Sequence, residues 1–386
     1  MSTDTPPRTA APRRRPRDRK QQILTAARDQ FWSRGYHQVG MAELAAAVDI
    51  GASALYRHFR SKHDLLLAAL DEDLTAAERT VGLTGADVVD GLARVGLERR
   101  GFGLLWEREA GHLLPAERIA IWRRLRRLAE AVEAAVPAPD AANLRAWAAL
   151  SVTNSPSHHR VALDQERFRR LLGEAAHACL AVSLPDPPRP APVPRRAGRG
   201  LAPASRREAL LAAALRLFAE RGYPSVGLTD IGAATGIAGP SVYNHFPTKV
   251  DLLDAALRRG EERLWLGLHH VLARADDEAS ALRALVEDYT AFAHTDPRLV
   301  GVLHSELIHL PEERRAVFRT HQLEYVAEWV ALLGIVRPDL DATECRVLVH
   351  AALAVVNGLA RVRPLHRRPG LASEIATLGH ATLRGR

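Results

Sequence analysis

Cysteine and long hydrophobic runs are scarce in this sequence. Only Cys179 and Cys345 occur among its 386 residues, which excludes a disulfide framework and suits a reducing cytoplasm. The longest uncharged apolar run of the second half, residues 347–360, is shorter than the roughly 20 residues that a membrane helix needs. The arginines near the N-terminus precede no apolar stretch, so no secretory signal is indicated. We therefore expect a cytoplasmic protein without a membrane span, in which residues 347–360 form a buried core helix.

Signatures of catalysis and metal binding are missing as well. The sequence contains no Cys-x-x-Cys pair and no nucleophile elbow. His304 and His309 lie five residues apart and would point about 140° apart on a helix, whereas a zinc-binding pair needs a spacing of four. The glycine-rich GAATGIAG (232–239) follows a helical pattern rather than a strand, which argues against a phosphate-binding loop. We expect no enzyme, no metal and no cofactor.

Strand-forming runs are absent too. Alternating β-branched residues do not occur, and alanine, leucine, arginine and glutamate dominate both halves. This composition predicts an all-α fold.

Arginine is in excess in two segments. Residues 1–20 and 183–207 each carry a net charge of +5, against +8 for the whole chain. A basic arm on a near-neutral body suggests a polyanion partner, and a solubilising tail is the alternative. The arm, residues 1–18, either contacts a DNA minor groove or stays disordered. Residues 183–204 are also rich in proline, which cannot continue a helix, so they predict a linker between two halves.

The two halves repeat each other. Residues 31–66 and 218–253 are identical at 16 of 36 positions, at a constant offset of 187. Weaker matches continue at an offset of 196 and then at 203, where Asn154 corresponds to Asn357. We interpret this pattern as the duplication of a whole half and not of one motif.

Each copy begins with the pattern of a helix-turn-helix. Its first helix has apolar residues four positions apart, which form one buried stripe. A glycine ends that helix, because glycine accepts the left-handed conformation of a helix end. The stripes are Ile23, Ala27 and Phe31, then Leu210, Ala214 and Phe218, and the glycines are Gly35 and Gly222.

Two short helices joined by a tight turn follow in each copy, over residues 41–59 and 229–246. The second helix must enter a major groove, so its base-facing positions must be small or polar. A further helix then starts with the spacing of a capping box, at Ser61 and at Thr248. The base-facing positions are Ala52, Ser53 and Ala54 in the first half, and Gly239, Pro240 and Ser241 in the second.

The repeated stretches RGYHQVGMAELAAAVDIGASALYRHF (34–59) and RGYPSVGLTDIGAATGIAGPSVYNHF (221–246) resemble the DNA-binding domain of tetracycline-repressor-like (TetR/AcrR) transcriptional regulators. The resemblance implies three DNA-binding helices followed by a larger helical domain that binds a small ligand and forms the dimer. Each half has about the length of one such subunit, so the chain is expected to hold two tandem units.

The resemblance also implies which residues meet DNA. The tyrosines and lysines of the motif would contact phosphate, and the histidines would lie near the DNA backbone at the end of the recognition helix. Core packing is the alternative for the tyrosines and histidines. The implied contacts are Tyr56, Arg57, His58 and Lys62 in the first half, and Thr229, Tyr243, Asn244, His245 and Lys249 in the second, beside the base-facing positions above.

Two departures from the family pattern affect specificity. Gly51 and Ala238 stand where the family commonly has serine or threonine at the start of the recognition helix. Many members open the preceding helix with a pair of threonines, where this chain has Gly40-Met41 in the first copy and Gly227-Leu228, followed by Thr229, in the second. We therefore expect the two copies to read different half-sites.

The expected organisation is two similar halves with one linker. The domains are a basic disordered arm (1–18), a DNA-binding domain (19–68), a helical regulatory domain (69–182), the linker (183–204), a second DNA-binding domain (205–256) and a second regulatory or ligand domain (257–386).

The sequence names no ligand, but polar and aromatic residues mark the regulatory helices. Core packing and interface contacts are the alternative explanation for each of them. The candidate ligand residues are Trp106, His112, Trp265, Tyr289, His304, His309 and Asn357.

We thus expect a transcriptional regulator that binds duplex DNA, most simply a repressor that responds to an unknown small molecule. A helical architectural protein that coats nucleic acid without sensing a ligand is the alternative. The closing helices of the halves, around residues 148–152 and 347–359, are expected to pack together as an intramolecular pseudo-dimer on an imperfect palindrome. A homodimer of chains is the competing arrangement.

Overall fold

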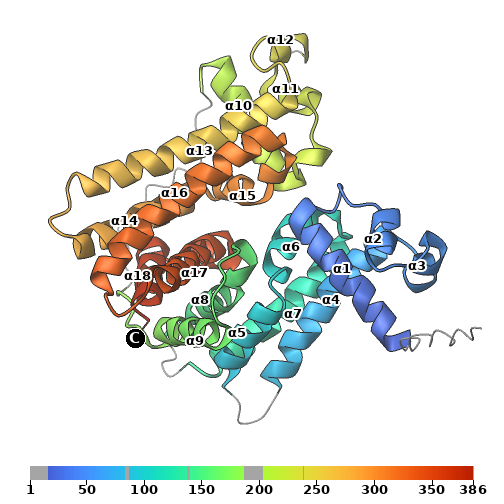
Figure 1. Ribbon diagram of the computed structural model, residues 1–386. Helices are drawn as coiled ribbons and strands as arrows, with labels where there is room; N and C mark the ends of the chain where they lie inside the picture. Colours follow the sequence, from blue (N-terminus) through green and yellow to red (C-terminus); the bar gives the residue numbers. More distant parts are fainter. Residues whose placement is uncertain (1–15, 83–86, 137–139, 187–202, 238, 386) are drawn as a thin grey trace, which may run out of the picture. The chain divides into compact units, whose positions relative to one another are not determined.

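The computed structural model describes residues 16–82, 87–136, 140–186, 203–237 and 239–385. These residues form helices and turns without a strand among them, which confirms the all-α fold (Figure 1). They divide into two compact units, Met1–Glu72 and Asp73–Arg386. The division falls inside a helix of the first half and not at the linker, because the second unit unites the regulatory helices of both halves with the second helix-turn-helix.

Parts of the expected arm and linker, residues 1–15 and 187–202, lie outside the described residues. The first helix begins at Pro16. The last three residues of the expected arm therefore belong to a helix, which corrects the predicted boundary at residue 18.

The first unit is a helix-turn-helix domain. Phe31, Leu44 and Leu55 are buried at its centre, as the apolar pattern predicts. Gly35 ends the first helix with a φ of 86°, in the left-handed region that favours glycine. Its helices are α1 (Pro16–Arg34), α2 (Met41–Ala47), α3 (Ala52–His58) and the start of α4 (Lys62–Val81).

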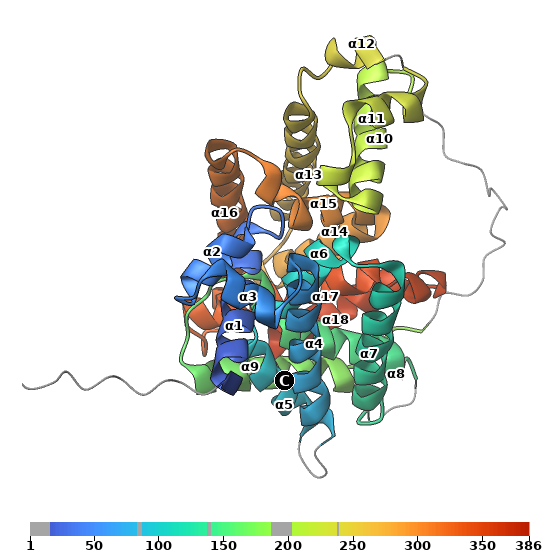
Figure 2. The same cartoon turned by 90° about the vertical axis from the view of Figure 1, so that its right-hand side faces the viewer.

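The second unit contains the other helix-turn-helix, with α10, α11 and α12 gathered at the start of the long helix α13 (Figure 2). Phe218, Ile231 and Val242 are buried there, and Gly222 repeats the positive φ, at 77°. The elements are α10 (Arg206–Arg221), η3 (Tyr223–Ser225), α11 (Leu228–Thr235), α12 (Gly239–Tyr243) and α13 (Lys249–Leu272).

The remaining helices of the second unit are the regulatory bodies of both halves. The first body has α5 (Val88–Glu98), α6 (Phe102–Glu109), η1 (Ala110–His112), α7 (Pro115–Glu133), α8 (Ala142–Asn154), η2 (Ser155–His158) and α9 (Gln165–Ala181). The second has α14 (Glu278–Thr295), α15 (Pro297–Ser305), η4 (Leu307–His309), α16 (Glu312–Val336), α17 (Ala342–Arg361), η5 (Arg363–Arg367) and α18 (Leu371–Arg384).

Helices α8 and α9 of the first half pack against α17 and α18 of the second (Figure 1). A Cβ atom added to Gly358 of α17 would lie 2.5 Å from the Oγ of Ser151 in α8, so a glycine permits this close approach. Arg167 pairs with Glu344 at 2.8 Å across the same junction. The expected packing of the closing helices is confirmed, and α9 and α18 complete it.

Helix α17 is long and apolar enough to cross a membrane by length and composition. Most of it is buried inside the structure, however, including Val347, Leu348, Val355 and Leu359. It is therefore the buried core helix that the sequence predicts.

Candidate nucleic-acid interface and effector cavities

The turn between α2 and α3 reverses the chain through one residue of positive φ. Asp49 has a φ of 53°, and the next amide, that of Ile50, donates a hydrogen bond to the carbonyl of Ala45 at 3.0 Å. Asp tolerates this left-handed conformation better than most residues with a side chain. The turn sets α3 against α2 with Leu44 and Leu55 buried between them.

The second copy makes the same turn with glycine. Gly236 has a φ of 69°, and Ile237 donates to the carbonyl of Gly232 at 3.0 Å. A Cβ on Gly232 would lie 2.8 Å from the carbonyl oxygen of Ile237 and 2.9 Å from a methyl of Val242. Unlike sequences thus fold to one turn geometry, which supports the interpretation of a duplicated half.

The recognition helices present polar surface to solvent. Tyr56 is 51% exposed and Tyr243 is 54% exposed, so both lie outside the core, and phosphate contact stays a prediction for them.

Both capping hydroxyls are confirmed: the amides of Asp64 and Asp251 donate to Ser61 and Thr248. Of the other predicted contacts, Ala52, Ser53, Arg57, His58, Thr229 and Asn244 are exposed, and Ala54, Ser241 and His245 are half-buried. Gly239 and Pro240 belong to α12, and their exposure lies outside what the structure describes.

The motif lysines have a structural task that the sequence interpretation missed. Lys62 Nζ donates to the carbonyls of Tyr36 at 2.8 Å and Val39 at 3.0 Å, and lies 4.3 Å from the centre of the Tyr36 ring. Lys249 Nζ donates to the carbonyls of Tyr223 and Val226, both at 2.9 Å. Each lysine thus ties the start of a long helix to the turn after the first helix. Phosphate contact stays a prediction for both.

A second repeated contact fixes the first helix of each copy. Lys20 lies 5.8 Å from the centre of the Phe59 ring, and the guanidinium of Arg207 lies 4.5 Å from that of Phe246. Both pairs are separated by the same number of residues in sequence, at the 187-residue offset. A cation over a buried aromatic ring stabilises this packing modestly. The recurrence of a cation before the first apolar stripe was a signal that could have been found in the sequence.

Comparison with known proteins identifies the repeated unit. The profile of bacterial regulatory proteins of the tetR family matches residues 23–69 and 210–256. The chain is 31% identical over 147 residues to the HTH-type transcriptional repressor KstR2 of Mycolicibacterium smegmatis. This match covers 36% of this chain and 71% of that protein. The chain belongs to the tetR family. It is therefore a DNA-binding transcriptional regulator, and both helix-turn-helices carry the family's motif.

Two further matches each cover less than half of this chain. The chain is 37% identical over 101 residues to the HTH-type transcriptional activator FasR of Mycolicibacterium smegmatis, a match that covers 26% of this chain and spans only 46% of that relative. The solved structure of the ketosteroid transcriptional regulator KstR2 of Mycobacterium tuberculosis is 25% identical, with a TM-score of 0.41, and covers 47% of this chain and 95% of that one.

A cavity of about 590 Å³ lies along the second regulatory body of this tetR-family chain. Three of the predicted ligand residues, Trp265, Tyr289 and Asn357, line it. The Tyr289 hydroxyl donates to Asn357 Oδ1 at 3.0 Å, and burial raises the pKa of Tyr289 to about 12. The segment that contains His158 and His159 contributes from the first half, so both halves build this cavity.

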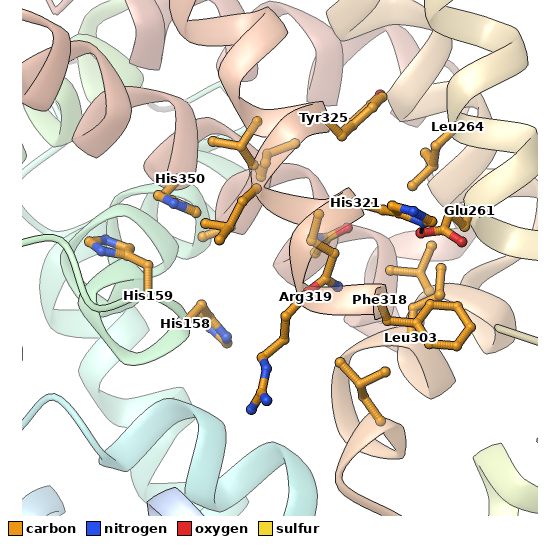
Figure 3. A pocket seen from close by; sticks show the side chains of 18 of the residues that line it. His158, His159, Glu261, Leu264, Leu303, Phe318, Arg319, His321, Tyr325 and His350 are labelled. Carbon is orange, nitrogen blue, oxygen red and sulfur yellow. Dashed lines mark hydrogen bonds and ion pairs between the residues drawn. The ribbon is translucent and has the colours of Figure 1, made fainter. Parts of the chain in front are cut away.

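Histidines form one side of the cavity. Figure 3 shows His158, His159 and His350 on one side, and Glu261 and His321 on the opposite side. The rings of His159 and His350 stack with centres 4.4 Å apart. Burial lowers the pKa of His159 to about 2 and that of His350 to about 4, with neighbouring cationic groups adding to the effect. Both rings are therefore neutral at pH 7.

Most charged side chains around the cavity are paired. Glu261 and His321 lie 2.7 Å apart, and burial raises the pKa of Glu261. Arg361 pairs with Glu107 of the first half at 2.7 Å. Arg346 has no hydrogen bond or ion pair among the described residues and lines the cavity one turn before His350.

The first regulatory body has a smaller cavity, of about 360 Å³. Trp106, a predicted ligand residue, lines it together with Trp122, Trp147 and Asn154. The rings of Trp122 and Trp147 stack with centres 5.4 Å apart and planes 11° apart. The two regulatory bodies therefore share a fold but differ in the volume and the lining residues of their cavities.

The predicted ligand residues His112 and His309 line neither cavity. His309 instead stacks on Tyr223 with ring centres 5.0 Å apart, and its Nε2 lies 3.4 Å from buried Glu306. His112 makes the corresponding pair with Glu109, also at 3.4 Å. Their i,i+3 spacing to a glutamate explains this placement, because it sets both side chains on one face of a turn.

One predicted ligand residue, His304, has a side chain outside the described part of the structure. The sequence analysis missed His158, His159, Arg346 and His350. His350 interrupts the apolar run of residues 347–360, and a lone histidine in a buried helix was the signal that could have found it.

Proposed function

We propose that the protein is a ligand-responsive repressor that binds an imperfect palindrome as a single chain. The observation that carries this proposal is the packing of α8 and α9 on α17 and α18 within one chain. The family resemblance implies that two separate subunits meet through such closing helices. Here the partners are covalently joined, which raises the effective concentration of one half for the other into roughly the millimolar range.

The two reading heads of the proposed repressor are unlike. Arg57 stands where the second copy has Asn244, and Ser53 stands where it has Pro240. Symmetric helix-turn-helix repressors read half-sites about 34 Å apart, one turn of DNA, or multiples of that distance. Unlike heads on such a frame favour half-sites of different sequence, which an obligate homodimer of identical subunits cannot exploit.

A physical connection between cavity and reading head supports the ligand response. Leu303 and Leu307 line the larger cavity. Between them, the carboxylate of buried Glu306 accepts a hydrogen bond from the amide of Tyr223 at 3.2 Å, at the base of the second helix-turn-helix. A ligand that displaces α15 would thus act on the segment that Lys249 also holds. Such coupling is reciprocal, so DNA would weaken ligand binding by the same factor.

The test begins with selection of an operator from random duplex DNA by the full chain. Footprinting on the selected site should show two protected half-sites, and light scattering of the complex should give one chain per minimal operator. Two chains per operator would reject the single-chain arrangement. Uniform protection along the DNA, without a preferred site, would reject a sequence-specific regulator altogether.

A further inference from the structure

The effector cavities of the two halves have diverged at one matching position. At the 203-residue offset that aligns Asn154 with Asn357, His350 of α17 corresponds to Trp147 of α8. Trp147 stacks on Trp122 in the first half. The first cavity is about 360 Å³, against about 590 Å³ for the second. Stacked tryptophans thus occupy space in the first half that the second half leaves open.

The larger cavity has an apolar part beside its histidine side. Leu264, Leu303 and Phe318 lie toward the side of Glu261 and His321 in Figure 3, away from His158, His159 and His350. Ligand sites typically have volumes of roughly 300–1,000 Å³ and bind with apolar walls and a few oriented polar groups. A mainly apolar ligand with one polar end fits this distribution of side chains.

The side of the cavity formed by His158, His159 and His350 carries a positive charge. Glu261 is the one carboxylate among the described lining residues, and it already pairs with His321 on the opposite side. Arg346 has no ion-pair partner among the described residues, and it lies close enough to His350 to disfavour a proton on that ring. In a partly desolvated site an uncompensated cation attracts an anion more strongly than it does in water.

His159 adds a hydrogen-bond donor on the same side of the cavity. The amide of Val161 donates to Nδ1 of His159 at 3.2 Å, so the neutral ring carries its proton on Nε2. That Nε2 is buried and has no hydrogen-bond partner in the part of the chain that the structure describes, although His159 lines the cavity. A buried N–H without an acceptor is unfavourable. A ligand oxygen would supply the acceptor that the protein lacks here.

We infer that the chain binds one effector, an elongated apolar molecule with a carboxylate at the end that meets Arg346 and the stacked rings of His159 and His350, in the cavity of its second half only. This inference rests on the proposed ligand response. It adds the chemical class of the effector, its orientation and a stoichiometry of one per chain, because stacked Trp122 and Trp147 occupy part of the corresponding site in the first half and leave it smaller.

Calorimetric titration of the full chain with three matched probes tests the inference. Dodecanoate, dodecan-1-ol and dodecan-1-amine share one chain length and differ in the end group. We expect dodecanoate to bind at one site per chain and at least ten-fold more tightly than the alcohol or the amine. Equal binding of the three, or tighter binding of the alcohol or the amine, would overturn the chemical class. Two equivalent sites per chain would overturn the restriction of binding to the second half.

Two variants locate the site. Arg346→Gln should remove most of the preference for dodecanoate over dodecan-1-ol, and His350→Trp, which copies the first half, should weaken dodecanoate binding at least ten-fold. Trp122→Phe in the first cavity is the matched control and should leave dodecanoate binding unchanged. Unchanged binding by both second-half variants would overturn the assignment. Circular dichroism of each variant shows that it is folded.

A separate measurement keeps this inference apart from the proposed function. Binding of the selected operator by the ligand-free protein tests DNA recognition alone. If the protein binds its operator but dodecanoate binds no more tightly than dodecan-1-ol, the inference about the carboxylate is wrong, and the proposed DNA-binding function is still supported. If no specific operator is bound, the proposed function fails whatever the probes do.

Discussion

Lys249 Nζ holds the carbonyl oxygen of Tyr223 at 2.9 Å and lies 4.1 Å from the centre of its ring. The same contact recurs 187 residues earlier between Lys62 and Tyr36. A cation that satisfies backbone carbonyls at a helix end stabilises the turn that positions the reading head. The motif lysine therefore has a structural role in the helix-turn-helix, independent of any contact that it makes with DNA.

Replacing Lys249 with alanine should therefore destabilise the protein. Charge-assisted hydrogen bonds contribute about 1.5–3 kcal/mol each, and partial exposure reduces that value here. We expect the free energy of unfolding, measured in urea, to fall by about 2 kcal/mol for Lys249→Ala. Tyr243→Ala, at an exposed position, should change it by no more than about 0.5 kcal/mol.

The salt dependence of operator binding separates the two roles of this lysine. Loss of a phosphate contact reduces the slope of log affinity against log salt by about one. A Lys249→Ala variant of unchanged stability but with a reduced slope would contradict the structural role. A destabilised variant with an unchanged slope would support it.

Gly358 and Ser151 report on the junction between the halves. Replacing a helical glycine with alanine normally stabilises a helix by about 1 kcal/mol. Here the added Cβ would lie 2.5 Å from Ser151 Oγ, and overpacking costs about 1–3 kcal/mol. We expect Gly358→Ala to be net destabilising in urea unfolding.

Removing the Ser151 hydroxyl should relieve part of that strain. The double variant Ser151→Ala with Gly358→Ala should be more stable than Gly358→Ala alone, which a double-mutant cycle measures as a coupling energy. A Gly358→Ala protein more stable than the wild type would show that α8 and α17 do not approach closely in solution.

The fold could be predicted from sequence because it depends on periodic and repeated features. The buried stripe at Ile23 and Phe31, the helix-ending Gly35 and the packing of α17 all follow from spacing and composition. The cavity could not be predicted in this way. His158 and His350 are 192 residues apart in sequence, and only the packing of the two halves places them on the same side of one cavity.

The role of the motif lysines shows a different limit. Lys62 follows a helix-capping Ser61, and a basic residue at a helix start suggests an anion partner. The carbonyls that Lys62 actually contacts belong to Tyr36 and Val39. Backbone carbonyls carry no signal in the residue types, so a sequence pattern cannot distinguish this use of a lysine from phosphate binding.

The buried histidines predict a loss of stability in mild acid. The folded-state pKa of His350 is about 4, below the value of 6.5 for an unperturbed ring. Burial and the nearby His158 and Arg346 lower the pKa of His350. The pKa of His159, whose ring stacks on that of His350, is lowered further. Unfolded chains therefore take up protons below about pH 6.5 that the folded chain does not take up. The stabilisation is complete above this pH and declines as pH falls toward 4.

Unfolding in urea at a series of pH values measures this effect. Each such histidine contributes a slope of up to about 1.4 kcal/mol per pH unit. Carboxyl groups with a raised pKa, such as Glu306, act in the opposite direction, so the informative quantity is a difference between proteins. His350→Gln should flatten the curve between about pH 5 and 6.5 relative to the wild type. Parallel curves for the two proteins would contradict the prediction.

The exposed recognition tyrosines allow each reading head to be tested separately. Tyr56→Ala should weaken protection of one half-site, and Tyr243→Ala should weaken protection of the other. A hydrogen bond to a charged phosphate is worth about 1.5–3 kcal/mol, so each variant should lose roughly ten-fold or more in operator affinity. Footprinting of an operator labelled on one strand measures the two half-sites independently. The stability of both variants in urea is the control.

The pattern of protection also distinguishes a single chain from a symmetric dimer of chains. In a symmetric dimer the two-fold axis places the same reading head on both half-sites, so Tyr56→Ala would weaken both half-sites equally or neither. In a single chain the two heads differ, and each variant affects only its own side. Reversing the order of the two half-sites, with their flanking bases fixed, should move the defect of Tyr56→Ala to the opposite end of the operator. A defect that stays at one end, or that appears at both, would reject the single-chain arrangement.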